Sequence, residues 1–356
     1  RNSNGRVVLT ATKGNNTVYG AEYGAYASGK EEIQILAANG ANNIEGEVEA
    51  ALYSHNGLVT ASAIDNNIKS DKNALYAHGG RINVESTGTT KMIGDVVADE
   101  YAERAGYAKA GFDSEKSYLL GAVHTDDWFA LYSTTDLTFT DGATWYLTDN
   151  SNVSDLTLAN GIVDLTANEK GNAHQVSIDR YLSGSGLFKL DLTYLDNDVA
   201  SYMNAENSDF IYIYGGDNSE QNIEFAINDA NLGAMKSGDK LYFAQVHDDA
   251  ATFGQGETIK RANEDSIYDN QYRIDFEEHE EAIASALSLA NDDSAGDKPS
   301  EIVPMYSDWF ITCEKGDINP NGETPVQSYN AGFALWRDDD TLLKRLGELR
   351  YPNDGG

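Results

Sequence analysis

Cysteine and proline are both scarce in this chain of 356 residues. It contains one cysteine, Cys313, and five prolines, against 33 glycines and 21 tyrosines. A single cysteine excludes an internal disulfide, so the fold needs another source of stability, and stacked backbone hydrogen bonds would supply one. We expect Cys313 to be a half-buried strand residue and not a reactive thiol. Abundant glycine and tyrosine favour a β-rich chain with many tight turns.

Positive charge is also in short supply. There are 25 Lys and Arg residues and 58 Asp and Glu residues, which gives a net charge of −33. This acidity argues against nucleic acid or anionic lipid as a partner, because like charges repel and no basic patch interrupts it. The chain lacks an apolar run of about 18 residues, so we expect no membrane-spanning segment. We also expect that the segment beginning at Arg1 is not a signal peptide.

The chain does contain an internal repeat, over residues 1 to about 100. Three strand-like patterns recur in phase, at spacings of about 24–26 residues. The first pattern occurs at Asn15–Val18, Asn42–Ile44, Asn66–Ile68 and Thr90–Ile93. The second occurs at Ala25–Tyr26, Ala51–Tyr53 and Ala74–Tyr76, and the third at Ile33–Ile35, Leu58–Val59 and Ile82–Val84.

Three strands per period predict a three-sided parallel β-helix. One coil needs three strands of roughly 4–5 residues and three corners, and successive coils stack about 4.8 Å apart. Val, Ile, Leu and Tyr side chains should point inward in columns, and the asparagines can form ladders at the corners. A leucine-rich repeat needs its own leucine and asparagine frame, and a propeller blade needs a period of about 40 residues, so neither fits.

Beyond residue 100 the period fades. We expect Tyr101–Phe112 to be a loop or a short helix. From Trp145 to Phe253, short alternating strands follow one another between Gly, Asn and Asp turns. The glycines of Gly184-Ser185-Gly186 let backbone approach backbone, which predicts a packed corner covered by Phe188.

The order of motifs in this second half resembles the pertactin-like C-terminal passenger region of bacterial type V autotransporters, which is called the autochaperone. The resemblance implies a cap that folds first as it leaves a translocator barrel and then templates the remaining coils. The matching residues are Trp145, Leu156, Leu158, Gly161, Val163, Leu165, Tyr181, Leu182, Ser183, Gly184, Ser185, Gly186, Phe188, Ser208, Asp209, Leu241, Val246 and Phe253.

A second resemblance lies at the end of the chain. Residues 336–350 are similar to the linker helix that enters the translocator barrel of those proteins, and we expect the barrel itself to be absent from this chain. The segment predicts a helix by its own signals: aspartates at its start, basic residues near its end, an apolar stripe and a terminating proline. The matching residues are Trp336, Leu342, Arg345, Leu346 and Leu349.

The sequence thus divides into five parts. β-Helix repeats occupy 1–138 and the pertactin-like cap occupies 139–262. An acidic, partly helical excursion follows over 263–304, in which Glu277–Glu281 leads into a helix predicted over Ala282–Ala290. A last strand and a polar linker occupy 305–335, and the linker helix occupies 336–356.

Motifs for catalysis are weak. Gly184-Ser185-Gly186 lacks the frame of a serine hydrolase. Ile283 stands where a zinc-protease helix beginning at His279 would need its second histidine. His55 and His78 fall at the same point of successive repeats and should stack on one face, either as solvated residues or as a metal-binding or acid-sensing pair.

A cation site at 317–328 is also a weak candidate. Asp317, Asn319 and Asn321 match the start of a calcium loop, but Ser328 stands in place of the glutamate that should close it. We therefore expect a polar linker at this position and no cofactor.

We predict an all-β, right-handed parallel β-helix with a C-terminal β-rich cap and a short C-terminal helix. The resemblance and the weak catalytic motifs favour a non-catalytic passenger, surface-displayed or secreted at a Gram-negative-type outer membrane, that acts as an adhesin or as a self-association module in aggregation and biofilm formation. The expected partners are its own translocator barrel, a host-surface protein or glycan, or another copy of itself. Two alternatives stay open: a glycan-active hydrolase on the same scaffold and a purely structural stalk.

Overall fold

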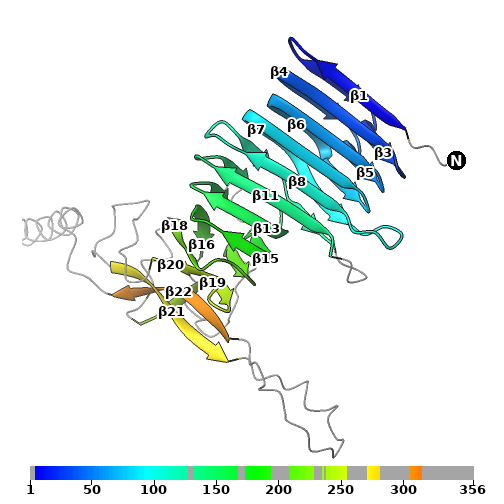
Figure 1. Cartoon of the computed structure of the whole chain (residues 1–356). Helices are drawn as coiled ribbons and strands as arrows, with labels where there is room; N and C mark the ends of the chain where they lie inside the picture. The colour runs from blue at the N-terminus through cyan, green and yellow to red at the C-terminus, as the bar shows by residue number, and fades with distance from the viewer. Residues whose placement is uncertain are drawn as a thin grey trace, which may run out of the picture.

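The strands of the protein stack along one axis into a parallel β-solenoid of about 7 turns (Figure 1). The computed structural model describes residues 5–126, 132–166, 173–193, 208–227, 235, 238–254, 271–280 and 305–314. These residues are all-β, which confirms the predicted fold class and the parallel solenoid. Across these ranges there is no helix that could cross a lipid bilayer.

The strand bounds are β1 Arg6–Ala11, β2 Asn16–Gly20, β3 Tyr23–Ser28, β4 Glu32–Gly46, β5 Ala50–His55, β6 Leu58–His78, β7 Arg81–Asp99, β8 Tyr107–Phe112, β9 Tyr118–Leu120, β10 Val123–Thr125 and β11 Thr134–Thr140. They continue as β12 Thr144–Tyr146, β13 Ser151–Ala159, β14 Ile162–Asp164, β15 Gln175–Ser183, β16 Leu187–Leu192, β17 Phe210–Ile213, β18 Ser219–Ile227, β19 Lys240–His247, β20 Ala251–Phe253, β21 Gln271–Glu280 and β22 Met305–Glu314.

Most of the parallel pairs between coils fall into three series, which we call ladders A, B and C. Ladder A joins β1, β4, β6, β7, β8, β11, β13 and β15. Ladder B joins β2, β4, β6, β7, β9, β12, β14, β16 and β18. Ladder C joins β3, β5, β6, β7 and β10. The long strands β4, β6 and β7 pass from one ladder to the next.

The registers confirm the repeat that the sequence predicts. On ladder B, Asn16 pairs with Asn42, and Asn42 with Asn66. The other two patterns occupy ladders C and A in the same way, through the pairs Tyr26–Tyr53, Tyr53–Tyr76, Ile33–Val59 and Val59–Ile82. Each period of sequence is therefore one coil.

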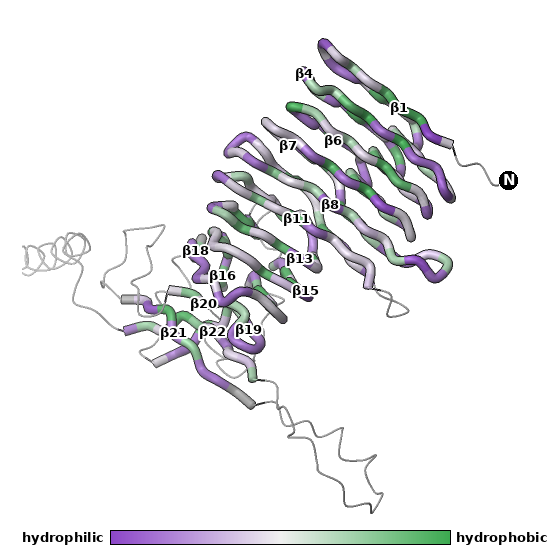
Figure 2. Tube along the Cα trace, in the orientation of Figure 1, coloured by the Kyte–Doolittle hydropathy of each residue, from purple (hydrophilic) through white to green (hydrophobic). Residues whose placement is uncertain are grey.

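Inside the solenoid, apolar side chains form the predicted columns, because alternate residues of each strand point to the axis. Hydropathy accordingly alternates along the strands (Figure 2). Burying one such side chain stabilises the fold by roughly 1.5–3 kcal/mol relative to exposure. The buried columns are Ile35, Ala61, Val84, Ala110, Leu137 and Leu156 on ladder A, Ile44, Ile68, Met92, Leu119, Trp145, Val163 and Phe188 on ladder B, and Leu52, Leu75, Val96 and Val123 on ladder C.

The tyrosines of ladder C do not join these columns, so the expectation that they point inward is wrong. Leu52 and Leu75 are fully buried, and the residue after each one must face the opposite side of the strand. Tyr53 and Tyr76 therefore point outward, as does Tyr26, which is 43% exposed. The Leu-Tyr pattern alone does not show which of the two side chains points inward. In the structure the smaller, aliphatic leucine does.

The asparagines form the predicted ladder, and they do so inside the molecule. Asn16 Nδ2 donates to Asn42 Oδ1 over 2.9 Å, and Asn42 Nδ2 donates to Asn66 Oδ1 over 3.0 Å. Asn66 Nδ2 completes the series by donating to the Glu85 carbonyl oxygen over 2.8 Å. Asn42 and Asn66 are fully buried, so this ladder satisfies carbonyl groups that the corner between ladders A and B would otherwise leave unpaired.

Two segments differ from the sequence prediction. Part of the expected loop or helix at 101–112 is the strand β8, whose Ala108, Ala110 and Phe112 are buried in the core. The acidic stretch of the predicted excursion holds the strand β21, which pairs antiparallel with β22. β22 also pairs antiparallel with β19, so the last parallel coil is followed by an antiparallel sheet.

Candidate functional site

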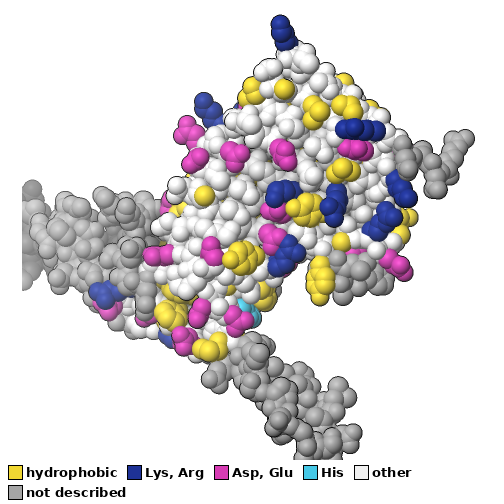
Figure 3. All heavy atoms as spheres, in the orientation of Figure 1, with side chains coloured by type: hydrophobic (Ala, Val, Ile, Leu, Met, Phe, Trp, Pro, Cys, Tyr) yellow, Lys and Arg dark blue, Asp and Glu magenta, His cyan; other side chains and the backbone are white. Residues whose placement is uncertain are grey.

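Outward-facing side chains form straight rows on the solenoid, because the same register that aligns the core also aligns the surface. On ladder A these rows carry opposite charges side by side, and Figure 3 shows acidic and basic groups interspersed on that face. Lys109 Nζ lies 2.7 Å from Asp136 Oδ2, and Arg6 Nε lies 3.4 Å from Glu32 Oε2. Such charges neutralise one another and mark a solvated face. The outer faces of ladders B and C carry other features.

The outer face of ladder C carries a continuous aromatic surface, which we call the tyrosine row: Tyr23, Tyr26, Tyr53 and Tyr76. Ring centroids lie 4.9 Å apart for Tyr23 and Tyr53, 5.2 Å for Tyr26 and Tyr53, and 5.0 Å for Tyr53 and Tyr76. These distances match attractive ring pairs. The row therefore combines apolar rings with hydroxyl groups on an exposed sheet.

Next to the tyrosine row lies a second group, the histidine cluster: His55, His78, Asp99 and Tyr101. The two imidazole rings lie 5.1 Å apart on successive coils, which confirms the predicted stacking. His78 Nδ1 lies 2.7 Å from Asp99 Oδ1, and the Tyr101 ring covers both imidazoles at 4.2 and 4.5 Å. Among the residues with described placement, no group of three or more His, Cys, Asp or Glu side chains is arranged to hold a metal ion.

Burial and neighbouring groups set the protonation of these side chains. Burial raises the pKa of Tyr53 to about 12, and the hydroxyls of Tyr23 and Tyr26 add to the effect. Burial and the Asp99 carboxylate also raise the pKa of Tyr76. Burial, followed by the charge of His78, lowers the pKa of His55, and Asp99 partly opposes this. At neutral pH Tyr53 and Tyr76 therefore present uncharged hydroxyl groups.

Tyr101 reaches the histidines through a tight hairpin. Tyr101 and Arg104 exchange two backbone hydrogen bonds of 3.0 and 3.1 Å. Between them Ala102 and Glu103 both have positive φ, at 49° and 59°. This conformation is normally taken by Gly or Asn and costs of order 1 kcal/mol for other residues. The chain tolerates this strain in the turn that sets Tyr101 against the two imidazoles.

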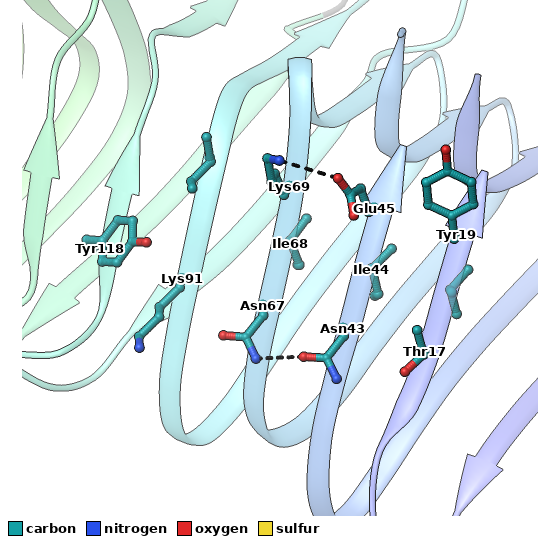
Figure 4. A pocket seen from close by; sticks show the side chains of 12 residues that line it. Thr17, Tyr19, Asn43, Ile44, Glu45, Asn67, Ile68, Lys69, Lys91 and Tyr118 are labelled. Atoms are coloured by element: carbon teal, nitrogen blue, oxygen red, sulfur yellow. Dashed lines mark hydrogen bonds and ion pairs between the residues drawn. The ribbon is translucent and has the colours of Figure 1, made fainter. Parts of the chain in front are cut away.

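Ladder B carries a shallow groove of about 350 Å³, shown in Figure 4. Two outward rows line it. Thr17, Asn43, Asn67, Lys91 and Tyr118 form one row, and Tyr19, Glu45, Lys69 and Ile93 form the other. The groove therefore crosses five successive strands of the ladder, with a tyrosine at each end.

Polar groups within the groove are only partly satisfied by one another. Asn67 Nδ2 donates to Asn43 Oδ1 over 2.9 Å, and Lys69 Nζ lies 3.3 Å from Glu45 Oε1 (Figure 4). In the part of the chain that the structure describes, Lys91 forms no ion pair. The groove thus contains one cation in excess of its carboxylates, within a strongly acidic protein.

The residues that carry the autochaperone resemblance lie mostly in the core. Tyr181, at 46% exposure, and Ser185 are the matched residues on the surface. The buried ones include Trp145, Leu156, Leu158, Phe188, Asp209, Val246 and Phe253. Trp145 Nε1 donates to the Gly121 carbonyl over 3.0 Å, so its polar atom is satisfied inside the core. Burial is consistent with a structural role, and their templating role stays a prediction.

The Gly184-Ser185-Gly186 corner is confirmed as a packed turn. Gly184 has φ of +71°, and a Cβ atom there would lie 2.3 Å from the Leu158 carbonyl oxygen. The Gly186 N–H donates to Gln221 Oε1 over 3.0 Å. The Phe188 side chain is buried next to this turn. Close backbone approach explains the glycines, as the sequence predicts.

Asp209 is a buried carboxylate between coils. Its two oxygens accept backbone N–H bonds of 2.7 Å from His174 and from Asp191. Burial raises the pKa of Asp209 to about 7, and these two hydrogen bonds oppose the rise. The Ser-Asp motif gave no sign of this burial, because the enclosing coils come from distant sequence.

The remaining predicted elements lie outside the described residues. These are the linker-helix residues Trp336, Leu342, Arg345, Leu346 and Leu349, the calcium-loop candidates Asp317, Asn319 and Asn321, and the helix at 282–290. Cys313 forms no disulfide and is fully buried in β22 instead of half-buried.

The tyrosine row and the groove were not predicted as sites. The signals were present, since tyrosine recurs in phase at 26, 53 and 76 and the polar residues recur at 43, 67 and 91. Each signal is visible only once the register shows which face every residue occupies. Comparison with known proteins adds no identification, since no family model and no curated protein matches the chain.

Proposed function

We propose that this chain is the passenger part of an autotransporter-like protein, wound as a three-sided, right-handed β-helix and displayed at the cell surface or secreted. Its role is non-catalytic adhesion or self-association. The ordered series of autochaperone-like motifs supports the first part, together with the parallel solenoid on which they lie. A solenoid suits this role because every coil adds surface without adding a new core.

The tyrosine row carries the proposal for adhesion. Contiguous aromatic surface on a protein marks an interaction site more often than isolated apolar residues do. Tyrosine is also enriched in interfaces, because its ring buries a large area and its hydroxyl forms hydrogen bonds. Tyr26 of this row and Tyr101 of the adjacent histidine cluster are both more than 40% exposed, so the aromatic surface is open to a partner.

Adhesion is tested with the chain coupled to beads. Bead–bead aggregation measures self-association, and retention on a mucin-coated surface measures adhesion to glycoprotein. The double variant Tyr26→Ser, Tyr53→Ser should reduce at least one of these by about tenfold or more, since interface tyrosines are typical hot spots. Tyr181→Ser is the control, because Tyr181 is equally exposed but lies on ladder A. Unchanged aggregation and retention in the double variant would overturn the proposal.

One observation favours the alternative of a glycan-active hydrolase. A concavity of about 440 Å³ near β20–β22 is lined by Glu220, Asp249 and Glu278 together with Phe253 and Trp309. Carboxylates beside aromatic rings are what glycoside hydrolysis uses. Release of reducing ends from polysaccharide, abolished in Glu220→Gln or Glu278→Gln, would support hydrolysis over adhesion. The stalk hypothesis requires that neither activity is found.

A further inference from the structure

We propose that the groove on ladder B binds an acidic oligosaccharide, one whose sugar units carry carboxylates. Lys91 would bind a carboxylate, the asparagine pair would bind sugar hydroxyls, and the terminal tyrosines would contact sugar rings. The inference rests on the proposed adhesive role and names the ligand class for one surface of it. The groove is distinct from the tyrosine row, which lies on ladder C.

The charge of the groove points to an anionic ligand. Lys69 and Glu45 neutralise each other at 3.3 Å, so Lys91 supplies the net charge of the lining residues. Lys91 lies in the row between Asn67 and Tyr118. A lone ammonium without an ion-pair partner in the described structure is free to bind a carboxylate, and such charge-assisted bonds are stronger than neutral ones. The net charge of −33 disfavours densely charged polyanions such as nucleic acid.

The asparagine pair supplies the complementary groups for sugar hydroxyls. One hydrogen bond joins Asn67 Nδ2 to Asn43 Oδ1, which fixes the orientation of both amides. The Asn43 amino group and the Asn67 carbonyl oxygen are then left to act as donor and acceptor on neighbouring coils. A hydroxyl group both donates and accepts, so adjacent hydroxyls of one sugar ring can satisfy both amides at once.

The length of the groove calls for an oligomer. From Thr17 to Tyr118 it crosses five strands, whose spacing gives a span of about 19 Å. Tyr19, which is 61% exposed, and Tyr118 stand at opposite ends of the groove (Figure 4). Their rings offer apolar faces to the C–H groups of sugars, as aromatic residues do in many ligand sites. A single small anion would leave most of these groups unused.

The test uses the full chain and two probes that differ only in charge, an oligogalacturonate and its methyl ester, in calorimetric or NMR titrations. We expect the oligogalacturonate to bind and the methyl ester to bind at least about tenfold more weakly. Lys91→Met should weaken oligogalacturonate binding to a similar degree. Lys72→Met is the matched control and should change affinity less than about twofold, because Lys72 is paired with Glu49 outside the groove.

Each other outcome overturns the inference. Equal binding of the methyl ester, or unchanged binding by Lys91→Met, would remove the role of charge. Equal binding of polyglutamate would make the site a general polyanion site and not a saccharide site. If no saccharide binds while beads still aggregate or adhere through the tyrosine row, the ligand class fails and the adhesive function stands. If the bead assays fail as well, the proposed function fails with it.

Discussion

At the scale of single residues, the buried asparagines are the side chains whose polar atoms all need a hydrogen-bond partner inside the solenoid. Asn42 Nδ2 lies within hydrogen-bond distance of Asn66 Oδ1 and of the Ile35 and Ser62 carbonyls, while its Oδ1 accepts from Asn16. Polar groups with no exposure to water must be paired, because an unpaired one costs about 1–3 kcal/mol. The amide ladder thus helps to fix the register of ladder B, together with the apolar columns.

Replacing Asn42 tests this. Asn42→Ala leaves its partners on both neighbouring coils unpaired, so we expect a loss of about 2–4 kcal/mol in the free energy of unfolding. Asn43→Ala, one residue along on the outer surface, should cost less than about 1 kcal/mol. Urea denaturation followed by circular dichroism measures both. Equal effects of the two substitutions would contradict a structural role for the buried ladder.

Asp209 predicts a pH dependence of stability. The pKa of Asp209 is raised from 3.8 to about 7 in the folded protein, mainly by burial. Between these values the unfolded chain releases the proton and the folded chain keeps it, so stability falls as pH rises from about 4 to about 7. The full difference is about 4 kcal/mol. Above pH 7 this contribution is constant.

The substitution Asp209→Asn isolates the effect, because it removes the titrating group and keeps one oxygen to accept a backbone N–H. Denaturation midpoints measured at pH 5, 6, 7 and 8 should decline more steeply for the natural chain than for the variant. The difference between the two curves matters here, since the many other carboxylates titrate equally in both. Parallel curves would show that Asp209 titrates normally.

At the scale of elements, turns decide where each strand begins. Gly184 combines a positive φ with a close approach to the Leu158 carbonyl oxygen, and an added methyl group would meet that oxygen at 2.3 Å. Gly111 lies in the outward face of β8, where an added methyl group would meet no atom closer than 3.9 Å. Replacement by alanine should therefore be unfavourable at Gly184 and tolerated at Gly111.

We expect Gly184→Ala to destabilise the protein by more than about 2 kcal/mol, from backbone strain and overlap together. Gly111→Ala should be neutral or stabilising by up to about 1 kcal/mol, because the extended backbone tolerates Cβ and glycine loses more entropy on folding. Thermal melting of the two variants compares them directly. A harmless Gly184→Ala would mean that the corner rearranges easily.

The sequence predicted elements well where one face alternates and a repeat sets the register. Ladders A, B and C over the first hundred residues follow from the recurring Asn, Ile and Leu-Tyr patterns. β8 was missed because alanine, its main core residue, has no strand preference and signals helix as strongly. β21 was missed because four charged or polar residues, Glu277–Glu280, end the strand and conceal the inward Tyr272, Ile274 and Phe276.

At the scale of the whole molecule, stability is a sum over coils and their neighbours, so a solenoid can fold from one stable end. The large core side chains lie in the later coils: Phe112 and Phe139 stack at 4.5 Å, and Phe139 and Trp145 at 6.2 Å. The buried core of the earlier coils is aliphatic and ranges from Ala51 and Ala74 to Ile44 and Leu52. Among the described residues, the fully buried aromatic side chains thus lie in the later coils, which supports the proposed templating by the C-terminal coils.

Templating predicts an asymmetry in folding kinetics. Trp145→Ala should slow refolding, whereas Leu52→Ala should mainly speed unfolding, although each removes about 2–5 kcal/mol of core packing. Stopped-flow refolding and unfolding in urea separate the two effects. In the proposed autotransporter precursor, deletion of residues 145–253 should leave the rest of this chain sensitive to protease. Slower refolding in Leu52→Ala, or a resistant passenger after the deletion, would contradict templating.

The alignment of one coil with the next also governs how the surface can change in length. From Asn42 to Asn66 the chain advances by one coil and each outer row gains one side chain. Duplication of a single period would extend every row by one step while each existing contact keeps its geometry. The number of binding groups presented to a long polymer could thus change one at a time, by the addition or removal of whole periods of sequence. No individual contact would have to change.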